Sequence, residues 1–188
     1  ISQTFVVDVA AVNDIPQGDV TTFNILEDTP LEVDLRTFVS DVETAAEDFV
    51  FNVSGAVNGT VELLADGHTA RFTPTANYNG PASFNYDVTD TGDGSAAAIT
   101  TGPLTMTVNV AAVNDDPVAT GTTLNTDEDT PVEIDLRTLV DDVETADDDL
   151  VFSVSGAVNG TVELLANGYT ARFTPGANYN GPASFNYD

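Results

Sequence analysis

The chain has 188 residues, 41% of them hydrophobic, and its 31 acidic residues against four basic ones give a formal net charge of −27. This charge disfavours a nucleic-acid partner, because binding to phosphates requires basic side chains. No apolar run approaches the roughly 20 residues that cross a bilayer, so we expect no membrane partner. Cysteine and lysine are absent, which excludes disulfides and lysine-based isopeptide crosslinks. Since like charges oppose a compact state, metal ions are the remaining candidate for a stabilising crosslink.

The sequence repeats itself at an offset of 101 residues without a gap. Residues 15–87 and 116–188 are identical at 54 of 73 aligned positions, and residues 1–14 align with 102–115. We therefore expect the last strand and linker of a preceding repeat at 1–14, a complete repeat at 15–115, and a second repeat at 116–188 that lacks its last strand. With no initiator methionine or signal peptide, the chain is interpreted as an internal stretch of a longer array. Such arrays usually provide length and surface rather than chemistry.

Apolar and polar residues alternate along most of each repeat, which is typical of half-buried β-strands. The pattern predicts seven strands in the complete repeat and the same series 101 residues later as far as the sixth. The predicted strands lie near residues 20–26, 31–35, 49–54, 60–65, 69–73, 82–88 and 104–110. Asn58-Gly59 and Asp66-Gly67 supply tight turns, and the acidic stretch 36–48 is expected to hold a short helical turn. Seven strands per repeat predict an all-β sandwich.

Acidic residues recur in the loops that such a sandwich places at its two ends. At the end where a repeat begins, the candidates are Asn13, Asp14, Asp41, Glu43, Asp87 and Asp90, with Asn114, Asp115, Asp142, Glu144 and Asp188 as their counterparts in the second copy. At the opposite end they are Glu27 and Asp28, with Glu128 and Asp129 as counterparts. Stacking of the copies end to end would bring Glu27, Asp28, Asn114, Asp115, Asp142, Glu144 and Asp188 to one junction.

Oxygen ligands of this kind favour Ca²⁺, which accepts carboxylate, amide and main-chain oxygens in flexible geometry, over Mg²⁺ with its stricter octahedron. Zinc is disfavoured, because there is no cysteine and the single histidine, His68, is replaced by Tyr169 in the second copy. The segment from Asp90 to Gly94 resembles part of a calcium loop but lacks the full EF-hand spacing and terminal glutamate. The alternative is that these carboxylates are solvated loop residues.

Three motifs occur in both copies. They are Val-Asn-Asp-x-Pro (12–16 and 113–117), Glu-Asp-Thr-Pro (27–30 and 128–131) and Phe-Thr-Pro-x-Ala-Asn-Tyr-Asn-Gly (72–80 and 173–181). Together they resemble the cadherin-like repeats of large bacterial surface adhesins of the RTX type, and the likeness covers essentially the whole chain. The resemblance implies tandem seven-stranded cadherin/immunoglobulin-like β-sandwiches on the cell surface. It also implies Ca²⁺ at domain junctions and a spacer role that holds a ligand-binding region away from the cell.

The sequence thus favours a calcium-stiffened extender module of an extracellular adhesin. An enzyme is not expected, since there is no cysteine, lysine or retained histidine to act as nucleophile or base. One alternative is a module that binds polysaccharide or a partner cell. Another is a strand-exchanged fibre subunit, in which residues 1–14 of one molecule, or an equivalent continuation of a longer chain, supply the strand missing from the second copy. Asn58 and Asn159 also fit glycosylation acceptors, although a tight hairpin explains the same Asn-Gly pairs.

Overall fold

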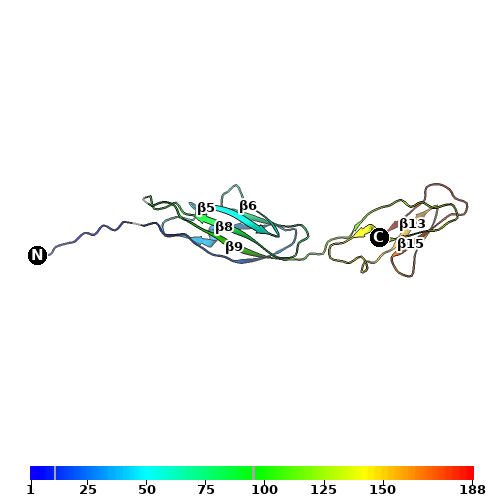
Figure 1. Ribbon diagram of the computed structural model, residues 1–188, viewed down its shortest axis with the longest axis horizontal. Helices are drawn as coiled ribbons and strands as arrows, with labels where there is room; N and C mark the ends of the chain where they lie inside the picture. Colours follow the sequence, from blue (N-terminus) through cyan, green and yellow to red (C-terminus); the bar gives the residue numbers. More distant parts are fainter. Residues whose placement is uncertain (11, 95) are drawn as a thin grey trace. The chain divides into compact units, whose positions relative to one another are not determined.

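The computed structural model describes residues 1–10, 12–94 and 96–188. The chain divides into two compact units, Ile1–Val113 and Asn114–Asp188, which Figure 1 labels by their strands. Each unit contains β-strands and one four-residue 3₁₀ helix, so the all-β prediction is confirmed. Among the described residues, no helix has the length and apolar character that a membrane crossing requires.

The first unit is built from two facing sheets. The larger sheet contains, in spatial order, β2 (Thr22–Leu26), β9 (Thr100–Ala111), β8 (Gly80–Thr89) and β5 (Val50–Val57), and the smaller contains β3 (Leu31–Asp34), β7 (Thr69–Pro74) and β6 (Gly59–Leu63). Only the β2–β9 pair is parallel. These seven strands match the seven predicted ones. The two-residue strands β1 (Gln17–Gly18) and β4 (Val39–Ser40) form an additional pair beside the 3₁₀ helix η1 (Leu35–Phe38).

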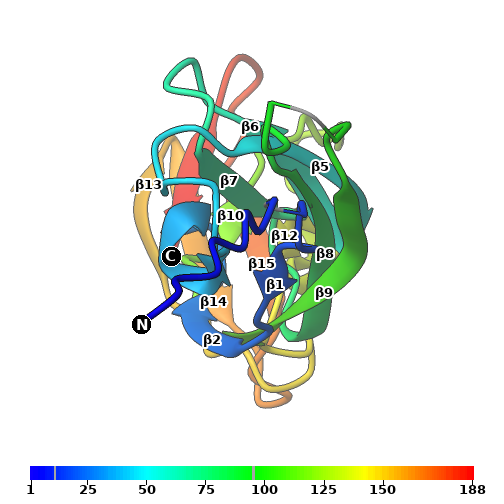
Figure 2. The ribbon, with the colours of Figure 1, turned by 90° about the vertical axis from the view of Figure 1, so that its left-hand side faces the viewer.

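The core of the first unit lies between these sheets because alternate side chains of each strand point inward. Phe72 of β7 stacks on Phe84 of β8, with ring centroids 5.8 Å apart. Met106 and Val108 of β9 and Tyr86 of β8 are completely buried beside them. Figure 2 shows β9, in green, running along β8 on one side of this unit. Strand β9 therefore covers the core and is also the parallel partner of β2.

The hairpin between β5 and β6 forms at the predicted Asn58-Gly59 turn. Asn58 adopts a left-handed conformation with φ of 57°, which asparagine tolerates better than most residues. A Cβ atom on Gly59 would lie 2.5 Å from the ring of Phe72, so glycine is required there by packing. The predicted helical turn is confirmed as η1, which begins one residue before the stretch in which it was expected.

The second unit repeats the smaller sheet of the first but contains less of the larger one. Its strands are β10 (Val118–Ala119), β11 (Val132–Asp135), β12 (Val140–Asp141), β13 (Val154–Val158), β14 (Gly160–Leu164), β15 (Thr170–Pro175) and β16 (Ser184–Tyr187), with the 3₁₀ helix η2 (Leu136–Leu139). The three-stranded sheet β11-β15-β14 matches β3-β7-β6. The other sheet consists of β13 and β16 only, apart from the short β10–β12 pair.

One strand prediction was wrong. The repeat pattern predicts a strand near residues 121–127, but Gly121–Asp127 contain none. The reason is the pairing of its counterpart, because β2 pairs only with β9 in the first unit. The 188 residues contain no second-copy counterpart of β9, so this segment lacks the strand with which its counterpart pairs.

Candidate functional site

The linker that enters the first unit is held by a buried side chain. Asn13 is only 7% exposed, and its Nδ2 donates hydrogen bonds to Oδ2 of Asp90 at 3.0 Å and to the carbonyl oxygen of Ala97 at 3.3 Å. Asp90 lies at the start of the loop between β8 and β9. The linker and this loop therefore meet, as the sequence predicted.

A third segment joins them from the loop that follows η1 and β4. Oε2 of Glu43 accepts a hydrogen bond from the main-chain amide of Asp14 at 3.2 Å. Oδ1 of Asp41 accepts the amides of Glu43 and Thr44, which fixes the shape of the loop. The Thr44 hydroxyl lies 3.3 Å from that of Thr91. We call the resulting cluster of Asn13, Asp14, Asp41, Glu43 and Asp90 the entry-end cluster.

Asp90 is the most buried carboxylate of the entry-end cluster. It is 3% exposed, and this burial raises the pKa of its carboxyl group. Hydrogen bonds from the amides of Ile99 and Gly92 and from the Asn13 side chain outweigh burial and lower the pKa below its usual value. Hydrogen bonds to a carboxylate favour its charged form. Asp90 is therefore an anion at neutral pH.

Two oxygens of the entry-end cluster are buried without a hydrogen-bond partner among the described residues. They are Oδ1 of Asn13 and Oδ2 of Asp41. Burying an acceptor with no partner costs about 1–3 kcal/mol, and a bound water or ion is one explanation for such an atom in a native fold. Both are oxygens of the type that Ca²⁺ binds. The cluster thus meets a chemical requirement for a cation site.

The carboxylates alone do not form a metal site. Across the residues that the structure describes, no group of three or more His, Cys, Asp or Glu side chains is placed to hold a metal ion. The acids of the entry-end cluster fall under this finding, so a cation there would need oxygens of other kinds beside the carboxylates, such as the amide Oδ1 of Asn13. Calcium accepts this mixture of ligands.

The structure differs from the sequence prediction at Asp87 and Asp93. Asp87 lies within β8 rather than in the loop, and its Oδ2 accepts a hydrogen bond from Nδ2 of Asn52 at 3.2 Å on the neighbouring strand β5. Asp93 was not among the candidate ligands, yet it lies in the same loop as Asp90, where its Oδ1 accepts the Ala96 amide. The partial calcium-loop pattern at 90–94 was the signal that pointed to Asp93.

The opposite end of the first unit holds the linker that leaves it. Glu27 is 2% exposed, and its Oε1 accepts the main-chain amide of Val113 at 2.6 Å while its own amide donates to Ala111. The other carboxylate oxygen of Glu27 is buried and has no hydrogen-bond partner in the described part of the chain. Oδ1 of Asp28 accepts the amide of Asn77 at 3.1 Å. Glu27 and Asp28, the two acids predicted at this end, therefore each fix a neighbouring segment by accepting a main-chain amide.

The second unit repeats part of the entry-end cluster. Oε2 of Glu144 accepts the amide of Asp115 at 3.0 Å, and Oδ1 of Asp142 accepts the amides of Thr145 and Glu144. The hydrogen bond from the Thr145 amide is the main cause of the lowered pKa of Asp142. Asn114, in contrast, is exposed, and its amide donates to the carbonyl of Asp115. The 188 residues contain no second-copy counterpart of Asp90 that could accept a hydrogen bond from the Asn114 side chain.

The remaining acids of the second unit lie elsewhere. Oδ1 of Asp129 accepts the amide of Asn178 at 2.8 Å, as Asp28 does with Asn77. Glu128 is exposed. Asp188 exchanges two main-chain hydrogen bonds with Ser153. Only part of the predicted set of the second unit is therefore brought together.

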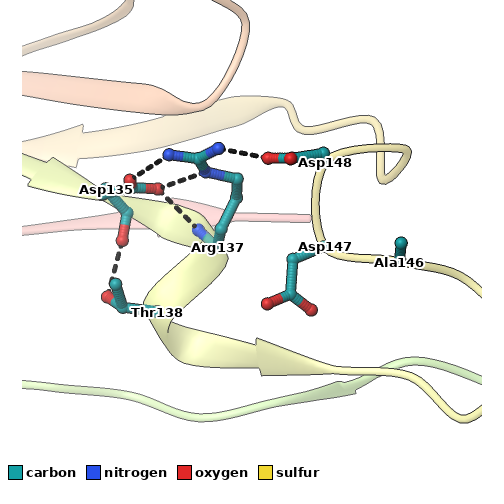
Figure 3. A pocket seen from close by; sticks show the side chains of 6 residues that line it. All are labelled: Asp135, Arg137, Thr138, Ala146, Asp147 and Asp148. Atoms are coloured by element: carbon teal, nitrogen blue, oxygen red, sulfur yellow. Dashed lines mark hydrogen bonds and ion pairs between the residues drawn. The ribbon is translucent and has the colours of Figure 1, made fainter.

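A separate pocket of about 400 Å³ lies in the second unit beside η2. Figure 3 shows the Arg137 guanidinium between Asp135 and Asp148, and Asp147 also lines the pocket. The hydrogen bond from Arg137 is the main cause of the lowered pKa of Asp135. The single positive charge of Arg137 is paired with two carboxylates, so this arrangement is a local ion-pair cluster.

The turn asparagines have a structural role. Nδ2 of Asn58 donates to Oη of Tyr78 at 2.7 Å and to the carbonyl of Pro81 at 3.0 Å. Asn159 makes the same two bonds with Tyr179 and Pro182. The nitrogen to which a glycan would attach is therefore used in closing this end of each unit, which favours the hairpin explanation.

Two-layered β units with the same loop motifs, repeated along one chain, define a tandem immunoglobulin/cadherin-like repeat protein. The family model described as bacterial Ig domain matches residues 10–102 and 114–188. The chain therefore belongs to the bacterial Ig domain family.

Several solved structures are similar to this chain at low sequence identity. An endo-fucoidan hydrolase of glycoside hydrolase family 107 is 18% identical, with 92% of this chain and 26% of that chain covered and a TM-score of 0.36. Protocadherin gamma B7 cadherin domains 1–4 are 15% identical, with 92% and 48% covered and a TM-score of 0.41. The human desmocollin-1 ectodomain is 15% identical, with 96% and 36% covered and a TM-score of 0.40. The chain thus spans less than half the length of each. Comparison with curated proteins gave no match.

Proposed function

We propose that this chain is a calcium-stiffened extender module of an extracellular bacterial adhesin of the RTX type. Its membership in the bacterial Ig domain family supports a repeat module, and domains of this family are usually extracellular. The observation that carries the proposal is the buried Oδ1 of Asn13, which has no hydrogen-bond partner in the described residues and lies in a cluster with the Asp90 anion.

The entry-end cluster would hold the ion first through the two buried oxygens that have no partner among the described residues, Oδ1 of Asn13 and Oδ2 of Asp41. Asp14, Glu43 and Asp90 are proposed to complete the site by moving toward the ion when it binds. The bound ion would supply positive charge to a unit whose acids repel one another. Because Asn13 and Asp14 belong to the linker, while the other three residues belong to loops of the sandwich, binding would fix the linker to the unit. A linker with less conformational freedom makes an array stiffer.

Glu27 and Asp28, with Glu128 and Asp129 in the second unit, are proposed as additional ligands where the linker leaves a unit. The support is the buried Oε2 of Glu27, without a hydrogen-bond partner in the described residues, next to the exiting residue Val113. The second unit repeats the first part of the entry-end cluster with Asn114, Asp115, Asp142 and Glu144, which we propose as ligands of an equivalent site. We also propose Asp87 and Asp188 as ligands at the periphery of the two sites, because they lie on strands or at strand ends.

Hydrogen exchange of the linker tests this role. Amides of residues 12–15 should exchange more slowly in millimolar Ca²⁺ than in chelator, while amides of β8, already protected in the sheet, should change little. Magnesium at the same concentration serves as the control ion. Equal exchange of the linker in Ca²⁺ and in chelator would contradict stiffening by the ion.

A second candidate function is polysaccharide binding. The observation that favours it is an open cavity of about 460 Å³ in the second unit, lined by Asn159, Thr161, Thr174 and Tyr179 among others. Its polar groups and aromatic ring are chemically suited to a sugar. A glycan array with the 188-residue chain separates the two functions, because an extender should bind no glycan, whereas a lectin should lose its binding when Tyr179 is replaced by alanine. Neither function requires catalysis.

A further inference from the structure

One peptide bond in the linker that enters the second unit differs in kind from its counterpart in the first. The chain contains nine prolines, and all but one of them follow isoleucine, threonine or glycine. Pro117 follows an aspartate, Asp116, where the first linker has Ile15 before Pro16. The rest of the Val-Asn-Asp-x-Pro motif is the same in both copies. The two linkers therefore differ in whether a carboxylate precedes the proline.

The side chain at this position faces solvent in both units. Ile15 is 50% exposed, and Asp116 is exposed as well. The carboxylate of Asp116 makes no hydrogen bond or ion pair with the residues that the structure describes. Oδ1 of Asp142, in contrast, is held by two main-chain amides. The side chain of Asp116 can therefore change its rotamer without breaking a contact of this kind.

The main chain on either side of the bond is anchored in the second unit. The amide of Asp115 donates to Oε2 of Glu144 at 3.0 Å. Strand β10, which begins directly after Pro117, pairs with β12. The bond between Asp116 and Pro117 crosses the short stretch between these two anchors. It thus has a fixed place in the fold, while the carboxylate beside it is unrestrained.

A carboxylate in this position can cleave the peptide bond that follows it. One Oδ of Asp116 attacks the main-chain carbonyl carbon of the same residue and closes a five-membered cyclic anhydride, which is a covalent use of an aspartate carboxylate. The C–N bond to Pro117 breaks, and the proline nitrogen takes a proton from the solvent and leaves as a secondary amine. Water then opens the anhydride and restores both carboxyl groups of Asp116. The sum is hydrolysis by one water molecule, with no oxidation or reduction.

The proline distinguishes this bond from the bonds that follow the other aspartates. Attack within one residue is intramolecular and costs little entropy at any aspartate. The nitrogen of an X–Pro bond, however, belongs to a tertiary amide, and its two alkyl substituents raise its affinity for the proton that it takes on leaving. Acid therefore accelerates cleavage of the Asp116–Pro117 bond more than cleavage after other aspartates.

We propose that the Asp116–Pro117 bond is a self-cleavage site that cuts the chain at the entrance of the second unit in acid. The products are residues 1–116, which end in aspartate, and residues 117–188, which begin with proline. The first linker is not cut, because Ile15 carries no nucleophile. In an array of such units, one cut would release all units on one side of it. The step uses solvent water and does not depend on a metal ion.

Intact-mass spectrometry of the 188-residue chain, incubated with chelator in acidic and in neutral buffer, tests the proposal separately from calcium binding. The wild type should give the two fragments, and more rapidly in acid. Asp116→Ile, which copies the first linker, should stay whole. Asp116→Glu keeps the charge but has to close a six-membered ring, and it should be cut at least about tenfold more slowly. An uncut wild type in acid, or equal cutting of Asp116→Ile, would overturn the proposal.

The role of the fold is tested by comparing folded with urea-unfolded protein, after circular dichroism has identified an acidic buffer in which the chain stays folded. Since the structure leaves Asp116 exposed and unrestrained, the folded and unfolded wild type should be cut at similar rates. In urea, Ile15→Asp should add a second cut before Pro16. Cutting of the wild type in urea alone would contradict the accessible site, and a missing second cut in Ile15→Asp would contradict the chemistry.

Discussion

Asn13 and Asp90 are joined by a buried hydrogen bond of 3.0 Å although 77 residues separate them. The bond ties the entering linker to the loop after β8. We expect Asn13→Ala to lower the free energy of unfolding of the first unit by about 1–3 kcal/mol, because it leaves the buried Oδ2 of Asp90 without this donor. Scanning calorimetry in chelator measures the effect. The matched control is Asn109→Ala, which removes an exposed bond to Asn24 and should cost less.

The lowered pKa of Asp90 makes part of the stability depend on pH. A carboxyl whose pKa is lower in the folded than in the unfolded state stabilises the fold above the unfolded-state value, about 3.9, and loses this contribution as the pH falls through the folded-state pKa. Asp90→Asn should therefore be less stable than the wild type at pH 7, and the difference should shrink below about pH 4. Unfolding of both proteins from pH 7 to pH 2 measures this. The exposed Asp116→Asn is the control, and a difference that stays constant with pH would count against the assignment.

The two units should respond unequally to the same core substitution. Phe84→Ala removes a completely buried ring and should cost about 3–5 kcal/mol in the first unit. Phe185→Ala should cost less in the second unit, since Phe185 is already partly exposed and its removal leaves a smaller cavity. Calorimetric transitions of the two variants make the comparison. Equal losses would indicate that the second unit has a complete core in solution.

A buried tyrosine fixes the first strands of the first unit. The hydroxyl of Tyr86 donates to the carbonyl of Asp19 at 2.7 Å, and burial raises the pKa of Tyr86 to about 12. Tyr86→Phe should destabilise the first unit by about 1–2 kcal/mol through the loss of this bond. Tyr187→Phe removes the equivalent bond to Thr120 at a more exposed site and should cost less. Absorbance titration of the wild type and of Tyr86→Phe checks the pKa, because the variant lacks the hydroxyl group that should ionise at about pH 12.

The sequence predicted the strands of the first unit because the alternation of period two and the Asn58-Gly59 turn are local signals. It also predicted that the linker and the loops that carry Asp41 and Asp90 lie at the same end, since alternating strands sort loops to two ends. It did not predict the place of Asp87, because a carboxylate on the outer face of a strand end looks like a loop residue in sequence. The strand near 121–127 failed for a non-local reason: β2 depends on β9, which is more than 70 residues away.

The buried, unpaired oxygens are a further property that sequence alone does not reveal. Asn13 was a candidate ligand by its motif, but only the structure shows that its Nδ2 is used by Asp90 and that its Oδ1 is enclosed without a partner among the described residues. Burial of this kind depends on how three separate segments pack, and periodicity carries no information about it.

Calorimetric titration of Ca²⁺ into chelator-treated protein tests the central claim most directly. The wild type should bind saturably, with a dissociation constant of about 10⁻⁴–10⁻³ M as is typical of extracellular modules, and Asp41→Asn combined with Asp90→Asn should lose at least one ion. At a Ca²⁺ concentration of about 100 times the dissociation constant, binding should add about 2.7 kcal/mol to the stability of the first unit. No binding heat and an unchanged unfolding temperature in millimolar Ca²⁺ would contradict the account.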